Sequence, residues 1–235
     1  MQRLLLVGLV LVLALSLDLK GLAADEDQEV AQAESQSVNQ LKRIGLAMHI
    51  YHDQQKTFPP VAITADGKPK LSWRVALLPY LEDPGAKELY GEFHLDEPWD
   101  SEHNKPLIAK IPEVYRCPRS KAAARGMTVY LAPIGPTTIF SGPEGTKMRQ
   151  ITDGTSNTIL IVEAAEDRAA PWTKPEDWKF DPAQPSVGLG GHFRNRLQFL
   201  FADGSVHAVR DTIDKDQLAP LFTRNGREVV VIPDN

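Results

Sequence analysis

The chain has 235 residues, of which 42% are hydrophobic and 24% charged, a composition typical of a globular protein with one sizeable core. The formal net charge of −5 is spread along the sequence. No basic patch is present to neutralise a phosphate backbone, which excludes a nucleic-acid partner. Cys117 is the only cysteine, so no disulfide can form within the chain, and we interpret Cys117 as a buried structural thiol.

Residues 1–23 have the pattern of a secretory signal peptide. A short basic start is followed by LLLVGLVLVLALSL and then by the small residues of GLAAD. The apolar run is shorter than the ~20 residues that a membrane span needs. We therefore predict cleavage after Ala23 or Ala24 and export to the periplasm, the cell surface or the medium. The chain would contact a membrane only if this segment stayed uncleaved.

A long amphipathic helix is expected next. Residues 24–37 are polar and acidic, and form either a spacer or the first turns of this helix. Apolar residues then recur at helical spacing, and Pro59–Pro60 stops the pattern. These residues, which we expect to face the core, include Val38, Leu41, Ile44, Met48 and Tyr51. Residues 38–235 are predicted to form a single domain.

The middle of the chain predicts shorter elements. ITADGKPK holds an Asp-Gly turn, and LSWRVALLPYLE has the pattern of a compact helix. Ser101 is a candidate N-cap for a helix in SEHNKPLIAKI. Near the C-terminus, DTIDKDQLAPLF predicts a helix capped by Asp211 or Thr212.

After residue 126 the pattern changes to short β-rich runs bounded by Gly, Pro, Asp and Asn. These runs are MTVYLAP, TTIF, TILIVEA, LQFLFA, SVHAV and EVVVI. Leu197, Phe199 and Phe201 alternate with other residues before Asp203–Gly204, which predicts a β-hairpin. A helix followed by strands favours an α+β fold, with the long N-terminal helix packed on an antiparallel β-sheet.

Three segments carry side chains that could bind a ligand or take part in catalysis. HLDEPWDSEH is an acidic loop that either is solvated and capped or binds a hard cation such as calcium. ITDGTSNTILIVE holds Ser156, but a turn that feeds a strand is not the setting of a serine nucleophile. Glu163 ends that strand and could point into a cleft. Trp172 and Trp178 either bind a ligand by stacking on sugars or partner proteins, or cover the core.

Seven segments together resemble a domain-of-unknown-function family of exported proteins that is abundant in planctomycetes. They are VNQLKRIGLAMHIYHDQQKTFPP, LSWRVALLPYLE, LDEPWDSEHNKPL, VYRCP, ITDGTSNTILIVEA, PWTKPEDW and LFADGSVH. The resemblance implies a fold like that of type IV pilins and pseudopilins. It also implies a C-terminal His-x9-Asp-Gly signature, which matches His192, Asp203 and Gly204, although ten residues separate His192 from Asp203 here.

The resemblance to pseudopilins also implies a calcium ion, because such proteins often hold one in C-terminal loops. Asp96 and Asp100 flank Glu97–Pro98–Trp99, and Asp203 lies in a second loop that could approach them. We predict these three aspartates as calcium ligands, since a cation that ties loops together would stabilise a chain without disulfides.

Three hypotheses for function follow. The favoured one is an exported, non-enzymatic structural or interaction protein with an extracytoplasmic protein or glycan as its partner. The second is a metal-dependent hydrolase that uses the carboxylates and histidines of residues 92–103 with His192 or Asp203. The third is a carbohydrate-binding module that uses Trp172 and Trp178. The first is favoured because no triad, phosphate loop or zinc spacing occurs in the sequence.

Overall fold

A computed structural model describes the backbone of residues 2–227 and the side chains of residues 25–227. The chain divides into two compact units, Met1–Gln36 and Ser37–Asn235. The side chains of the predicted signal segment and the whole of the predicted strand EVVVI lie outside the described residues. Within residues 25–227, whose side chains are described, no helix is long and apolar enough to cross a membrane.

Helix α1 (Gln2–Gln55) ends shortly before Pro59, as the sequence predicts, and it includes residues 24–37. From Ser37 onward the helix is part of the folded domain. Leu41, Ile44 and Met48 are fully buried, which confirms the predicted apolar face. Gly45 lies against strand β9, and a Cβ atom there would come within 2.9 Å of a Leu200 methyl group. The missing side chain therefore lets the helix lie close to the sheet.

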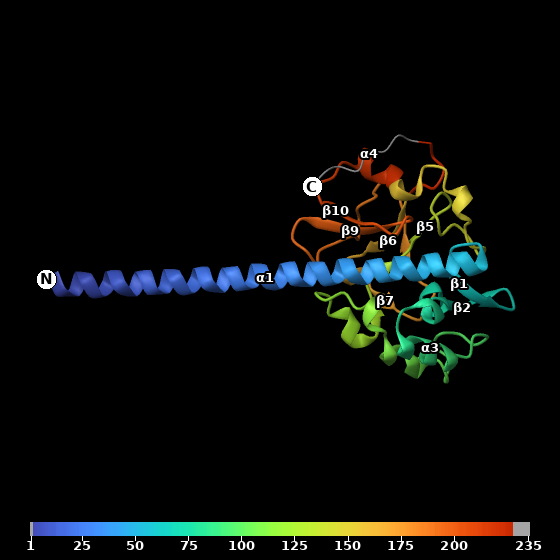
Figure 1. The fold of residues 1–235 in the computed structure, drawn as a ribbon, viewed down its shortest axis with the longest axis horizontal. Helices are drawn as coiled ribbons and strands as arrows, with labels where there is room; N and C mark the ends of the chain where they lie inside the picture. Colours follow the sequence, from blue (N-terminus) through green and yellow to red (C-terminus); the bar gives the residue numbers. More distant parts are fainter. Residues whose placement is uncertain (1, 228–235) are drawn as a thin grey trace. The chain divides into compact units, whose positions relative to one another are not determined.

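The main sheet has four antiparallel strands in the order β10-β9-β6-β4. Figure 1 labels β10, β9 and β6 of this sheet. Its strands are β4 (Tyr130–Leu131), β6 (Ile159–Glu163), β9 (Arg196–Phe201) and β10 (Val206–Arg210). The predicted hairpin is confirmed: Val206 pairs with Leu200, and Gly204 in the turn has a φ of 89°. The α+β fold class is therefore confirmed as well.

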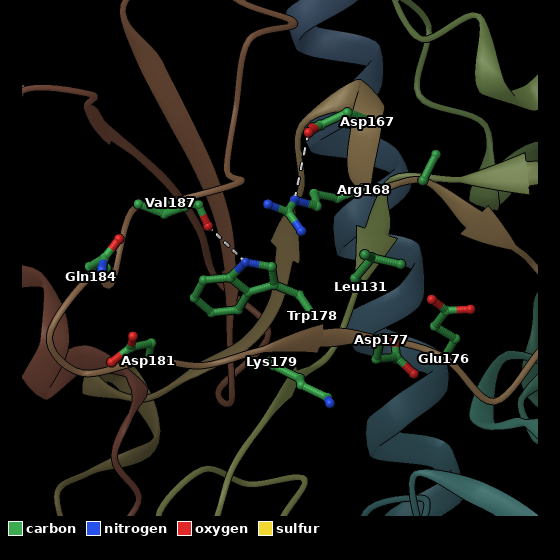
Figure 2. A pocket seen from close by; sticks show the side chains of 11 residues that line it. Leu131, Asp167, Arg168, Glu176, Asp177, Trp178, Lys179, Asp181, Gln184 and Val187 are labelled. Carbon is green, nitrogen blue, oxygen red and sulfur yellow. Dashed lines mark hydrogen bonds and ion pairs between the residues drawn. The ribbon is translucent and has the colours of Figure 1, made fainter.

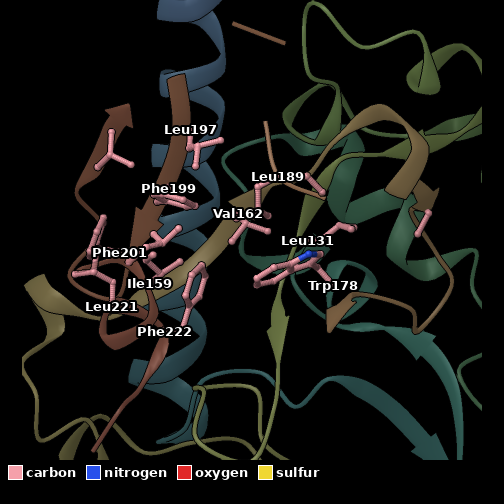
Figure 3. Packing of buried hydrophobic residues seen from close by; sticks show 14 residues of the cluster. Leu131, Ile159, Val162, Trp178, Leu189, Leu197, Phe199, Phe201, Leu221 and Phe222 are labelled. Atoms are coloured by element: carbon pink, nitrogen blue, oxygen red, sulfur yellow. The ribbon is translucent and has the colours of Figure 1, made fainter. Parts of the chain in front are cut away.

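Alternate residues of β9 face two different layers. Leu200 lies against α1, whereas Phe199 and Phe201 belong to an apolar cluster with Leu221 and Phe222 on the other face (Figure 3). The ring centroids of Phe199 and Phe222 are 6.0 Å apart in an edge-to-face arrangement. The sheet thus lies between α1 and the C-terminal helical segment.

Short elements complete the domain. Three further two-stranded sheets pair β1 (Ala62–Ala65) with β2 (Lys68–Ser72), β3 (Met127–Thr128) with β7 (Ala170–Pro171), and β5 (Pro133–Ile134) with β8 (Trp178–Lys179). The short α-helices are α2 (Trp73–Ala76), α3 (Pro84–Gly91) and α4 (Lys215–Leu218). The 3₁₀ turns are Leu78–Tyr80, Lys105–Lys110, Glu113–Tyr115, Ala122–Arg125, Met148–Gln150, Thr155–Asn157, Glu166–Arg168 and Ala219–Phe222.

Several predicted boundaries are wrong for local reasons. The helix in LSWRVALLPYLE is confined to α2, because Pro79 has no N–H group to continue it. Ser101 does not cap a helix directly; its hydroxyl accepts a hydrogen bond from the Asn104 N–H group, and a 3₁₀ turn follows. Helix α4 is capped by Asp214 instead of Asp211 or Thr212, because the Asp214 carboxylate accepts from the N–H group of residue 216.

Candidate functional site

Cys117, Glu163 and His192 meet in the interior of the domain. The Cys117 Sγ atom, a Glu163 carboxylate oxygen and a His192 ring nitrogen all lie within 4.8 Å of one another. The three residues are 3%, 1% and 8% exposed. Among the residues that the structure describes, this is the one group of three or more histidine, cysteine or acidic side chains arranged closely enough to hold a metal ion.

The end of strand β6 positions two members of this group. Glu163 is the last residue of β6, and its carbonyl oxygen accepts a hydrogen bond from the Gly190 N–H group at 2.9 Å. His192 Nε2 donates to the Ala164 carbonyl oxygen at 3.0 Å. Gly190 and Gly191 have φ values of 71° and 91°, which non-glycine residues rarely adopt. This glycine pair turns the chain back so that His192 reaches the end of β6.

Polar side chains from α1 and β4 surround the Glu163 carboxylate. The Ser37 hydroxyl donates to Glu163 Oε2 at 2.9 Å and lies 2.8 Å from the Tyr130 hydroxyl. Tyr130 is paired with Glu163 across strands β4 and β6, and its hydroxyl donates to Gln40 Oε1 at 3.0 Å. This network fixes the carboxylate in one orientation.

The interior setting determines the protonation of the group. Burial, followed by the nearby Glu163 carboxylate, raises the pKa of the Cys117 thiol to about 12. Burial also lowers the pKa of His192 below its usual 6.5. At neutral pH Cys117 is therefore a thiol, whereas a reactive cysteine requires a stabilised thiolate. Its buried position agrees with the interpretation from the sequence.

His192 and Asp203 of the predicted signature do not share a site. Asp203 is in the turn at the far end of β9, where Oδ1 accepts from the Ser205 N–H group at 2.9 Å and from its hydroxyl at 2.6 Å. Gly204 supplies the positive φ of that turn. The hydrolase hypothesis combines His192 with the carboxylates of residues 92–103, whereas the carboxylate that lies within 4.8 Å of His192 is that of Glu163, and both side chains are buried.

The predicted calcium ligands are not brought together. Within the described residues, Asp96, Asp100 and Asp203 form no cluster of metal-ligand distances. The loop that holds the first two is organised by the buried side chain of Asn104. Its Oδ1 atom accepts from the His94 N–H group, and its Nδ2 atom donates to three carbonyl oxygens, those of His94, Glu97 and Pro98. The Asn104 amide thus ties this loop together through four hydrogen bonds.

Neither Trp172 nor Trp178 offers an open ring face. Trp172 is fully buried, its ring stacks on Tyr115, and its Nε1 atom donates to the Ile108 carbonyl oxygen at 3.0 Å. Trp178 is 6% exposed, and its Nε1 atom donates to the Val187 carbonyl oxygen at 3.0 Å. The coplanar, exposed pair that the carbohydrate-binding hypothesis requires is not formed, because both rings pack against the core.

Trp178 does line a surface pocket of about 400 Å³ (Figure 2). Charged and polar side chains from the segment 167–184 surround it: Asp167, Arg168, Glu176, Lys179, Asp181 and Gln184. Val187, one of two large apolar side chains that are exposed among the described residues, stands at its edge with 52% exposure. The pocket therefore combines charges of both signs with an apolar edge.

The convergence of Cys117, Glu163 and His192 could not be predicted from the sequence. The segments that hold them are far apart in the chain, and no fixed spacing links them. Two signals were present nonetheless: Glu163 ends a predicted buried strand, and Gly190–Gly191 precedes the histidine. A polar side chain at the end of a buried strand can meet another residue where the chain reverses.

Comparison with known proteins identifies a family but no characterised relative. No curated protein and no solved structure matches the chain. A family model described as "Protein of unknown function (DUF1559)" matches residues 32–137 and 120–194, which together cover more than half of the sequence. The chain therefore belongs to this DUF1559 family.

Proposed function

We propose that this chain is an exported interaction module that binds a protein partner through the pocket beside Trp178. The observation that carries the proposal is the combination of an exposed Val187 with a charged pocket next to it. Export rests on the signal-peptide pattern of residues 1–23. A pilin-like role at the cell surface, as the sequence resemblance implies, is compatible with this function.

The chemistry of the pocket favours a polypeptide over a glycan. Protein interfaces combine an apolar centre with a polar rim. Here Val187 supplies apolar surface at the edge of the pocket, and Arg168 and Lys179 line the pocket together with acidic residues. Sugars, in contrast, stack on open aromatic faces, and the ring of Trp178 is 6% exposed. A peptide segment with an apolar side chain and charged neighbours of either sign fits this surface.

The pocket is supported by a rigid framework. Strand β8 pairs in parallel with β5, and the Trp178 ring packs 5.2 Å from that of Phe222 in the core. The Asp177 side chain, adjacent in sequence, is fully buried in an ion pair with Arg74. Residues at the pocket are therefore held in place before a partner arrives, which lowers the entropic cost of binding.

Site-specific photo-crosslinking in the organism that makes the protein would test this proposal. A crosslinking amino acid at Val187 should capture one defined protein. The matched control is Leu46 on α1, the other exposed large apolar residue among those described. Capture of the same proteins from both positions, or of glycan alone from Val187, would refute the proposal. Arg168→Glu should reduce the capture from position 187.

A further inference from the structure

We propose that Cys117, Glu163 and His192 bind a zinc ion inside the domain. The three side chains supply a cysteine sulfur, a carboxylate oxygen and an imidazole nitrogen within 4.8 Å of one another. The Cys117 thiol would release its proton to solvent as the zinc–sulfur bond forms. Sulfur, nitrogen and carboxylate oxygen are the donor atoms that zinc takes in proteins. They come from three separate segments of the chain, so an ion here would tie those segments together.

The separations suit zinc coordination. Zinc bonds of about 2.0–2.3 Å place two ligands of a tetrahedron roughly 3.3–3.8 Å apart. The distance from Cys117 Sγ to Glu163 Oε2 is 3.8 Å. A small approach of the His192 ring would complete the three-ligand set, and a water enclosed in the domain, with no position open to substrate, would be the fourth ligand. The same 3.8 Å contact in the absence of metal is a weak S–H···O hydrogen bond.

The surrounding hydrogen bonds are those expected around metal ligands. The His192 Nε2–H group donates to the Ala164 carbonyl oxygen, which leaves the lone pair on Nδ1 for a metal. The Ser37 hydroxyl donates to Glu163 Oε2. Backbone carbonyls that orient histidine and hydroxyls that orient carboxylate are common second partners of zinc ligands. These hydrogen bonds restrict the orientations of the histidine ring and the carboxylate before an ion binds.

Burial indicates a structural role for the ion. The three residues are all less than 9% exposed, whereas catalytic zinc requires a position open to substrate. The chain has one cysteine and so cannot form an internal disulfide. A zinc ion bound only by the folded state stabilises that state by mass action. This role is independent of the pocket beside Trp178, so either proposal can fail without the other.

The test uses the exported chain, unfolded under reducing conditions and refolded with zinc or with a chelator. We expect one zinc ion per chain by elemental analysis and a higher melting temperature for the zinc-refolded sample. Cys117→Ser should lose both the bound zinc and the shift in melting temperature. His94→Gln/His103→Gln is the control, because these two rings stack 3.5 Å apart on the surface and could hold an adventitious ion.

Three results would contradict the proposal. The first is zinc that remains in Cys117→Ser and disappears in the surface double variant. The second, which does not depend on the folding of a variant, is a wild-type protein refolded with cobalt that lacks the thiolate-to-cobalt absorption in the near ultraviolet. Ser37→Ala, which removes the hydroxyl that orients Glu163, should weaken zinc binding by about 10–100-fold. Unchanged affinity in this variant would contradict the assigned ligand set.

Discussion

Tyr130 lies between two buried polar clusters of different composition. Its backbone carbonyl accepts from Arg74 Nε at 3.1 Å and from Arg74 Nη2 at 3.0 Å, while Nη2 also reaches Asp177 Oδ1 at 2.5 Å. Its hydroxyl belongs to the network around Glu163. The first cluster contains its own cation, the Arg74 guanidinium. The second gathers a carboxylate, a thiol and an imidazole, which are donor types for a metal ion.

The comparison shows two ways of keeping a carboxylate inside one domain. Asp177 also accepts from the Trp73 indole and from the Ala132 N–H group, so protein groups complete its surroundings. Glu163 is oriented by a serine hydroxyl and lies beside ligands for a cation. Buried charges are stable when paired or when they coordinate a metal, and the two clusters illustrate these alternatives.

The largest effect should follow from breaking the first cluster. Arg74→Met leaves the buried Asp177 carboxylate without its guanidinium, and we expect a loss of about 3–5 kcal/mol in the free energy of unfolding. Urea denaturation measures this. The matched control is Arg168→Met, because Arg168 forms an exposed ion pair with Asp167 at 3.7 Å and should contribute about 0–1 kcal/mol. Similar losses in both variants would remove the distinction between buried and exposed pairs.

Alkaline pH should weaken the second cluster when no metal is bound. Burial raises the pKa of Cys117 from 9.0 to about 12, so between these values the folded state holds a proton that the unfolded state has lost. Stability should therefore fall as pH rises from about 9 toward 12, by at most about 1.4 kcal/mol per pH unit. Urea denaturation in chelator at several pH values measures the slope. The slope should be smaller in Cys117→Ala, and an equal slope would contradict the assignment.

Among the described residues, a third buried polar side chain has neither a charged partner nor neighbouring donor atoms for a metal ion. Gln198 is fully buried on β9, and neither polar atom of its amide has a hydrogen-bond partner among the described residues. Gln198→Leu should therefore stabilise the domain by about 1 kcal/mol, since an unsatisfied amide is replaced by an apolar side chain of similar size. The exposed Gln184→Leu should have little effect. The melting temperatures of both variants, compared with that of the wild type, test this prediction. Destabilisation by Gln198→Leu would show that the amide has a partner.

The smallest effect concerns a histidine at the edge of the domain. His52 Nε2 accepts from the Met148 N–H group at 3.3 Å, which requires a neutral ring. Burial is the main cause that lowers the pKa of His52 below 6.5, so this contact persists above that pH and is lost as pH falls through the lowered value. The NMR shift of the Met148 amide should titrate below pH 6.5 and become flat in His52→Leu. A titration centred above pH 6.5 would contradict the direction of the shift.

Local patterns in the sequence predicted the parts of the fold that depend on local periodicity. Leu41, Ile44 and Met48 recur at helical spacing and are buried, and Asp203–Gly204 joins two alternating strands as expected. The two-residue strands around residues 127–134 were seen only as one run, because pairing with distant segments determines where each begins. Helix caps were misplaced by a few residues, since several aspartates lie near each end.

The candidate sites depend on contacts between residues that are far apart in the chain, and the spacing of residues along the sequence does not reveal such contacts. Aspartates crowded near residue 100 predicted a cation, whereas the contacts that Asn104 makes in that loop could not be predicted from spacing. Arg74 in an apolar run was the available signal for a buried ion pair, and its partner Asp177 lies 103 residues away. The same limit applies to Cys117 and His192. A buried polar residue in an apolar run indicates that a partner exists, whereas only the fold identifies it.

The depth of the Cys117 cluster makes the order of events important for metal uptake. Because the three side chains are buried, we expect an ion to reach them most easily before the segment that bears His192 packs on the end of β6. Afterwards, entry and exit both require local opening of this segment, and their rates would follow its free energy of opening. Occupancy would then record the zinc available when the chain folded, rather than the zinc around the finished protein.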